Sequence, residues 1–128
     1  MKLLVDTCTF LWLVDDHPRL AARARDAIVD PANDVYLSAA SAWEIVIKHA
    51  LGRLELALAL DDYLPRQREL HGIEPLPIGE DATLALAKLP ARHKDPFDRI
   101  LVAQAIVGGC SLVTPDPLIK AYPVSILW

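Results

Sequence analysis

The chain has 128 residues, of which 53% are apolar, and a formal net charge of −4 at pH 7. This length predicts a single domain covering residues 1–128, and the apolar share exceeds the about 45–50% of ordinary globular proteins, which favours apolar surface left for a partner. The net charge argues against binding nucleic acid through a global positive field. The sequence contains no run of about 18 apolar residues, the length that would predict a membrane span. Two cysteines without CxxC spacing argue against a disulfide framework or a zinc site and indicate reduced thiols in the cytoplasm.

Strand and helix signals alternate along the chain. Segments that resemble strands lie at residues 3–5, 35–37, 74–78, 112–113 and 124–127. Helical patterns lie at residues 9–14, 18–29, 41–51, 61–71, 80–89 and 96–107. The two prolines in 74–78 restrict that strand to a sheet edge. The alternation predicts a three-layer α/β/α sandwich around a short central parallel sheet, with ligands at the carboxyl ends of the strands.

Two of the predicted helices have distinctive signals. Ser41-Ala42-Trp43-Glu44 has the spacing of a capping box, and the apolar stripe that follows predicts a long helix. The spacing of the apolar residues places Trp12 and Trp43 mostly in the core. The helix at 96–107 is apolar almost all round, so we expect it to be central and buried.

Four carboxylates from separated segments follow the strands or begin the helices: Asp6, Glu44, Asp98 and Asp116. The fold can bring them together at one edge of the sheet. A cluster of acids repels itself unless its members are protonated or hold a divalent cation. The pattern therefore points to metal chemistry on an anionic substrate.

Some of these acids also have a structural explanation. Glu44 is the fourth residue of the capping box and can pair with Lys48 one helical turn later. Asp95 and Asp116 each precede a proline, which is the arrangement of a helix N-cap followed by proline at the first helical position. For each of these residues in isolation, the structural role is the stronger interpretation.

Asp98 and Asp6 are harder to explain structurally. On its helix Asp98 stands at the head of a stripe formed by Leu101, Val102 and Ala105, and a carboxylate pointed toward the sheet is costly without a partner. Asp6 follows a strand end and has no obvious capping duty. A functional role is the stronger interpretation for both.

Several segments then carry a resemblance that covers the whole chain in order: Leu4-Val5-Asp6-Thr7, Ser38–Ile45, His93–Ala105, Leu112–Asp116, Tyr122-Pro123-Val124 and Trp128. They resemble the successive motifs of PIN-domain ribonucleases and are most similar to VapC-type toxins of type II toxin–antitoxin systems. One departure is Cys8, where many relatives have a polar residue. A thiol there puts an outer hydrogen bond to the site in doubt.

The resemblance implies endonucleolytic cleavage of RNA that depends on Mg²⁺ or Mn²⁺, with Asp6, Glu44, Asp98 and Asp116 as the catalytic and metal-binding acids. Hard oxygen ligands suit these ions, which keep several waters, and one such water can be acidified to attack phosphorus. We expect direct metal contact from Asp6 and Asp98. Glu44 would bind through water or help to deprotonate it, and Asp116 would hold a second metal or orient the first.

Other side chains have supporting roles in this interpretation. Thr7 and Thr114 could supply hydroxyl groups near the acids. Four cations near the acidic segments are candidates to hold the phosphodiester backbone: Lys48, Arg53, Lys94 and Arg99. For any one of them, a solvated surface position is the stronger interpretation, although Arg92, Lys94 and Arg99 could form a local basic cluster. His93 beside Asp95 is a poor metal-ligand set.

The resemblance also implies partners: an RNA substrate, a cognate antitoxin and a second copy of the chain in a homodimer, without a membrane. Two other classes of protein stay open. A haloacid-dehalogenase-like phosphatase also begins with a strand and an Asp, but it requires a second Asp where this chain has Cys8. A non-catalytic PIN-like binding module would use the acids only as helix caps, and a metal titration distinguishes it from a nuclease.

Overall fold

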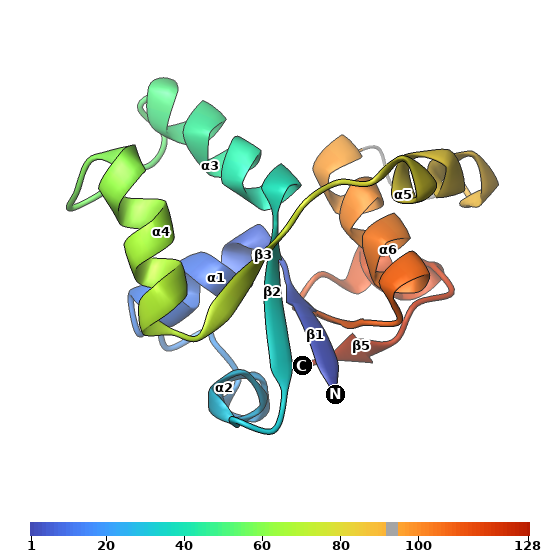
Figure 1. Cartoon of the computed structure of the whole chain (residues 1–128), viewed down its shortest axis with the longest axis horizontal. Helices are drawn as coiled ribbons and strands as arrows, with labels where there is room; N and C mark the ends of the chain where they lie inside the picture. Colours follow the sequence, from blue (N-terminus) through green and yellow to red (C-terminus); the bar gives the residue numbers. More distant parts are fainter. Residues whose placement is uncertain (92–94) are drawn as a thin grey trace.

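The computed structural model describes residues 1–91 and 95–128, and within them five parallel strands form one sheet in the order β3-β2-β1-β4-β5 (Figure 1). The strands are β1 Lys2–Val5, β2 Asp34–Ser38, β3 Ile73–Leu76, β4 Ser111–Val113 and β5 Ile126–Leu127. The helices are α1 Thr7–Val14, α2 Ala22–Val29, α3 Ala39–Ala50, α4 Leu60–Leu70, α5 Glu80–Ala85 and α6 Pro96–Gly108. Two 3₁₀ helices, η1 Leu86–Lys88 and η2 Pro117–Ala121, complete the described elements.

Helices cover both faces of this sheet, which confirms the predicted three-layer α/β/α sandwich. Leu3 and Val5 of the central strand pack with α1, α2 and α4 on one face. Leu4 points the other way and packs with α6 and η2, and the two groups of helices lie on opposite sides of the strands in Figure 1. Among the described residues, no helix is long and apolar enough to cross a membrane.

Three of the predicted helices begin two or more residues away from the expected start. Helix α1 begins at Thr7, two residues early, because Asp6 is its N-cap. Helix α2 begins at Ala22 and not at Pro18, because residues 18–20 form a turn in which the N–H of Leu20 donates to the carbonyl of His17 at 3.1 Å. Helix α3 begins at Ala39, where the Ser38 hydroxyl accepts the N–H of Ala40 at 3.0 Å. The predicted capping box at Ser41–Glu44 is therefore wrong.

The apolar stripe of α3 also faces away from the sheet. Trp43 is 60% exposed, and its ring meets that of Phe97 edge-on, with 5.1 Å between the ring centroids. Ile45, on the opposite side of the helix, is fully buried in the core. The prediction that Trp43 belongs to the core is wrong, whereas Trp12 is half-buried and packs against the core.

Helix α6 is central, as predicted, and its buried stretch runs from Ile100 to Ala105. Within that stretch Gln104 is only 4% exposed. Its amide accepts a hydrogen bond from the Ser38 hydroxyl and donates one to the carbonyl of Pro77 at 3.2 Å. This one side chain therefore joins α6 to the end of β2 and to the segment after the edge strand β3.

Replacing Gln104 tests this connection. Gln104→Leu removes the acceptor of the Ser38 O–H and the amide donor to the Pro77 carbonyl, and we expect it to lower the free energy of unfolding by about 1–3 kcal/mol. Chemical denaturation measures the loss. The matched control is Gln67→Leu on α4, at a half-buried position, for which we expect a change within about 0.5 kcal/mol. Equal effects of the two substitutions would contradict the assigned role of Gln104.

Candidate functional site

The strand order places the carboxyl ends of β1 and β4 side by side. In the sheet, β2 and β3 lie on one side of β1, and β4 and β5 lie on the other side. The strand order therefore reverses between β1 and β4, and in parallel α/β sheets a crevice lies at the carboxyl ends of the strands at such a point. The backbone N–H of Asp6, just beyond β1, donates to the carbonyl of Val113 at the end of β4 at 3.2 Å. Asp116 follows β4 by three residues and starts η2.

A pocket of about 380 Å³ lies at this point. Its lining residues are Asp6, Thr7, Cys8, Leu11, Trp12, Glu44, Lys48, Asp95, Asp98, Pro115 and Asp116. All four acids singled out in the sequence line it, together with a fifth, Asp95. The structure thus brings together side chains from the ends of β1 and β4, from α3 and from the start of α6.

Asp6 is the most deeply buried of these acids, with 6% of its surface exposed. Its Oδ1 accepts the backbone N–H of Thr9 at 2.8 Å, and its Oδ2 accepts the hydroxyl of Thr114 at 2.6 Å. The expectation that Asp6 has no capping duty is wrong. Burial raises the pKa of Asp6, against the effect of the Thr114 and Thr9 hydrogen bonds, and the nearby Glu44 raises it further. The charge on this carboxylate is therefore costly, and a bound cation would relieve that cost.

Glu44 faces the same pocket from α3. Its Oε1 accepts the hydroxyl of Thr7 at 2.7 Å, and its Oε2 lies 2.9 Å from Nζ of Lys48, which confirms the predicted pair one helical turn apart. The side chain of Glu44 is 14% exposed and that of Lys48 is 45% exposed. The predicted hydroxyl contributions of Thr7 and Thr114 are present, since each hydroxyl donates to one of the acids.

The three remaining acids begin helices. Oδ1 of Asp95 accepts the N–H of Phe97 at 2.9 Å, and Oδ1 of Asp116 accepts the N–H of Leu118 at 2.9 Å, so both predicted N-caps are confirmed. Asp98 is the third residue of α6 and lies half-buried in the pocket wall. Capping uses one oxygen of each N-cap residue, and the same residues still line the pocket.

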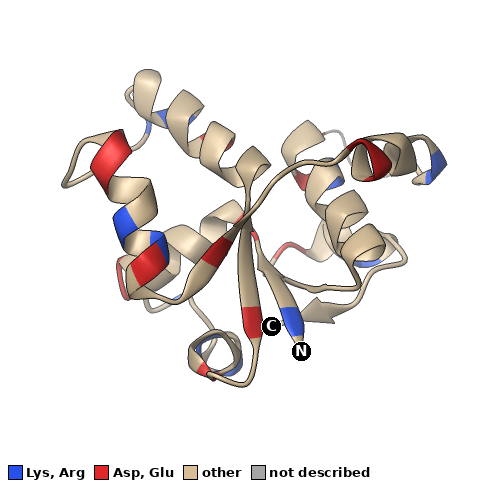
Figure 2. Ribbon diagram, viewed as in Figure 1, with Lys and Arg blue, Asp and Glu red and all other residues tan. Residues whose placement is uncertain are grey.

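Of the cations predicted to hold a phosphate, one lines this pocket among the described residues, and it is Lys48. Arg53 is exposed and lies outside the pocket lining. Lys94, with Arg92 and His93, lies outside the described residues. Lys and Arg are distributed over several elements in Figure 2, with no single basic element.

Arg99 has a different role from the predicted one. Its guanidinium donates to the carbonyl of Pro90 at 2.9 Å and to the carbonyl of Leu86 at 3.3 Å. A third bond, at 3.3 Å, reaches the hydroxyl of Tyr122. Arg99 therefore ties α6 to the segment after α5, and it does not line the carboxylate pocket.

Sequence reasoning did not foresee the part played by Thr9, and it singled out Cys8 as a departure from the pattern of the family. Thr9 orients Asp6 through its N–H, and the signal was available, because Asp is a preferred N-cap residue whose side chain accepts the N–H of the second or third helical residue. Cys8 is half-buried and lines the pocket. Burial, with the charge of Asp6 nearby, raises the pKa of the Cys8 thiol to about 11, so this group is a neutral thiol at physiological pH.

The donor chemistry of the pocket fits Mg²⁺ or Mn²⁺. These ions prefer carboxylate oxygens, and every acid in the lining supplies them. Within residues 1–91 and 95–128, no three His, Cys, Asp or Glu side chains form a ready-made metal cage. Mg²⁺ does not require one, because it is commonly held by one or two carboxylates and keeps several waters.

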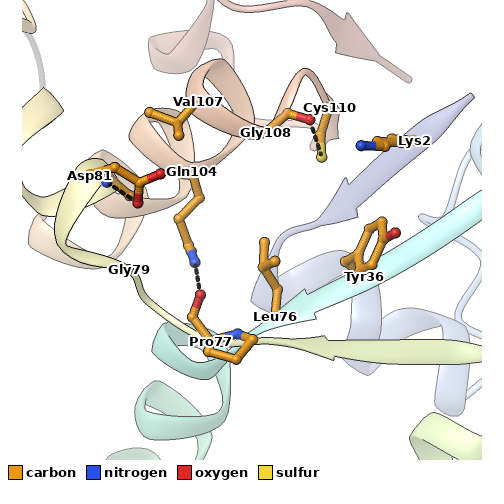
Figure 3. A pocket seen from close by; sticks show the side chains of 11 residues that line it. Lys2, Tyr36, Leu76, Pro77, Gly79, Asp81, Gln104, Val107, Gly108 and Cys110 are labelled. Carbon is orange, nitrogen blue, oxygen red and sulfur yellow. Dashed lines mark hydrogen bonds between the residues drawn. The ribbon is translucent and has the colours of Figure 1, made fainter.

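A second pocket, of about 310 Å³, lies between β1, β2, α5 and α6 (Figure 3). Lys2 and Tyr36 stand on one side of it and Gln104 on the other, with Leu76 between them. Its carboxylate, Asp81, accepts the N–H of Ala82 at 2.8 Å. Asp81 is the one acid in the lining of this pocket among the described residues, so the carboxylates that could hold a metal lie in the first pocket.

Comparisons with known proteins agree with this geometry. Residues 3–124 match the PIN domain family, so the chain belongs to that family. A curated relative, Ribonuclease VapC16 from Mycobacterium tuberculosis, is 42% identical over 66 residues. That alignment covers 48% of this chain and 47% of the relative, so the match spans about half the length of each protein.

Solved structures share the fold over nearly the full length. The chain is similar to one in VapBC2 from Rickettsia felis bound to a promoter DNA fragment, with a TM-score of 0.73 and 16% identity over 100% of this chain and 98% of that one. It is also similar to a chain of VapBC-1 from nontypeable Haemophilus influenzae, with a TM-score of 0.67 and 18% identity over 99% and 97% of the two chains. At these identities the likeness shows the fold alone.

The first test of the site needs no substrate. Because the folded pocket would bind the cation and relieve carboxylate repulsion, we expect Mg²⁺ or Mn²⁺ to raise the melting temperature, equivalent to about 2.7 kcal/mol at 100 times the dissociation constant. Asp98→Asn should remove most of the shift. The matched control is Asp81→Asn in the second pocket, which should keep it. A melting temperature that does not respond to either ion, measured by thermal denaturation, would exclude the metal site.

Proposed function

We propose that the chain is a Mg²⁺- or Mn²⁺-dependent endoribonuclease and the toxin of a toxin–antitoxin pair. The observation that carries this proposal is the convergence of Asp6, Glu44, Asp98 and Asp116 on one pocket at the crevice between β1 and β4. Membership of the PIN domain family supports it, and so does the name of the relative, Ribonuclease VapC16.

The reaction is the attack of a water oxygen on the phosphorus of an RNA phosphodiester, with departure of a ribose oxygen. A bound Mg²⁺ or Mn²⁺ supplies Lewis-acid polarisation of the phosphate and acidifies a water. Asp6 and Asp98 would hold the ion directly, and Thr9 and Thr114 keep the carboxylate of Asp6 in one orientation. This fixed orientation reduces the reorganisation needed during the reaction.

The other two acids have positions suited to handling water. Glu44 would accept the proton of the attacking water or bind the ion through water, and the hydroxyl of Thr7 holds its Oε1 in place. Asp116, anchored at the start of η2, would orient the first ion or hold a second. The leaving ribose oxygen takes a proton from solvent.

The toxin role rests on the family and its neighbours. The similar structures carry the names of toxin–antitoxin complexes, VapBC2 and VapBC-1. An antitoxin partner and a homodimer are therefore part of the proposal, and Trp43, Val46 and Leu51 of the α3 region, which are 60%, 41% and 61% exposed, supply an apolar surface for association. A toxin that cleaves cellular RNA acts in the cytoplasm, where the free thiols of Cys8 and Cys110 stay reduced.

The alternatives have less support. The PIN family match covers residues 3–124 and leaves a haloacid-dehalogenase-like phosphatase without a matching motif. A non-catalytic module would use the acids only as caps, yet Glu44 caps no helix and faces the same pocket as the others. That placement favours a catalytic pocket.

Substitutions of two neighbouring acids, Asp95 and Asp98, distinguish a catalytic role from a helix-capping role. Asp95→Ala removes the N-cap of α6, so it should cost about 1 kcal/mol of stability and leave much of the RNA cleavage rate. Asp98→Asn keeps the side-chain shape but removes a metal-binding charge, so it should abolish cleavage in a folded protein. Cleavage of RNA by the purified variants with and without Mg²⁺, together with their thermal unfolding, measures both effects. Normal cleavage by Asp98→Asn would show that this acid is assigned wrongly.

The toxin role has its own test in cells. Expression of the chain alone should arrest growth, and co-expression of the neighbouring gene, as the candidate antitoxin, should relieve the arrest. Asp6→Asn is the matched variant, because it removes one charge from the pocket. Cells that express it should continue to grow, and thermal unfolding checks that the variant is folded. Equal growth with the wild-type chain and with Asp6→Asn would rule out a nuclease toxin.

A further inference from the structure

The charges of the carboxylate pocket raise a problem for any anionic substrate. Five acids line it, and Lys48 is the one cation in that lining among the described residues. A phosphodiester that enters this pocket meets mostly negative charge. One divalent ion offsets part of that charge, but a direct donor to the phosphate oxygens is still needed.

Among the described residues, few donors are placed for that purpose, and Arg19, whose positive charge acts on the Cys8 thiol, does not line the pocket. The guanidinium of Arg99 is bonded to the carbonyls of Pro90 and Leu86, and Arg53 lies outside the pocket lining. Lys48 differs from both, because it lines the pocket itself. Its position on α3, one turn after Glu44, holds its ammonium group beside the acids.

The present partner of Lys48 does not account for its position. Glu44 is already held through its Oε1 by the hydroxyl of Thr7. A cation 2.9 Å from Oε2 of Glu44 opposes the binding of a metal ion in the same pocket. The side chain of Lys48 is 45% exposed and that of Glu44 is 14% exposed, so the ammonium can leave at little cost when another positive charge, such as a bound metal ion, takes its place beside Glu44.

We propose that Lys48 is a substrate-binding residue that leaves Glu44 and donates to the phosphate of the RNA when RNA and metal occupy the pocket. In the free chain its ammonium neutralises part of the charge of the carboxylate cluster. When the cation binds, Lys48 is displaced from Glu44, and the flexible four-carbon stem allows it to turn toward the incoming phosphate. This inference rests on the proposed ribonuclease function.

The inference predicts opposite effects on two measurements. Lys48→Gln should increase the affinity for Mg²⁺ about two- to threefold, because a competing positive charge is gone. The same substitution should lower kcat/KM for RNA cleavage by about tenfold or more, because a charge-assisted hydrogen bond to the phosphate is lost. Lys48→Arg should restore most of the cleavage, since it returns a cationic donor.

Salt dependence distinguishes phosphate contact from a structural role. Loss of one cation that contacts a single-stranded backbone should flatten the slope of log K for RNA binding against log salt by about 0.7. RNA binding is measured by fluorescence anisotropy with all the pocket acids intact and Ca²⁺ in place of Mg²⁺, with intact RNA verified on a gel, and Mg²⁺ affinity is measured by isothermal titration calorimetry without RNA. The matched control is Arg23→Gln, the same charge loss on α2 at the opposite end of the sheet (Figure 1), which should leave all three measurements unchanged.

Each result has a definite meaning. Lys48→Gln with tighter Mg²⁺ binding, slower cleavage and a flatter salt slope supports the inference. An unchanged salt slope, or cleavage equal to wild type, overturns it and leaves the ribonuclease proposal intact. A wild-type chain that cleaves no RNA in Mg²⁺ or Mn²⁺ overturns the ribonuclease proposal and, with it, this inference.

Discussion

The buried carboxylate of Asp6 connects the parts of the structure on which the site depends. It ends the central strand β1 and caps α1 through the N–H of Thr9. Its second oxygen accepts the hydroxyl of Thr114, which follows β4. One side chain therefore holds the start of helix α1 and links the ends of strands β1 and β4, and it also lines the pocket. Because the charge is buried, these contacts must all be satisfied at once.

Several acids can stand close together here because helix N-termini meet at the pocket. Asp6, Asp95 and Asp116 begin α1, α6 and η2, and each accepts a backbone N–H. Unpaired N–H groups and the helix dipole favour negative charge at that end of a helix, which offsets part of the repulsion among carboxylates. Capping and metal binding are thus compatible roles for one residue, since a cap uses a single carboxylate oxygen.

The sequence predicted the layers and the convergence of the acids, but not every local detail. Strand ends and helix starts lie at one edge of any parallel α/β sheet, so the positions of Asp98 and Asp116 could be inferred from the alternation alone. The strand order could not, because it depends on pairings between distant segments. The orientation of α3 was also misjudged: apolar side chains occur on both sides of this helix, and packing against the sheet buries Ile45 and leaves Trp43 exposed.

The charge balance of the pocket links metal binding to substrate binding in the proposed reaction. In the pocket lining that the described residues form, five carboxylates stand beside one ammonium group, and without a cation this negative charge opposes the approach of a phosphodiester. A divalent ion cancels two of these charges and also releases Lys48 from its competition for Glu44. The ion therefore contributes to RNA affinity as well as to chemistry. A chain with net charge −4 can act on RNA in this way, because charge at the scissile phosphate matters more there than the overall field.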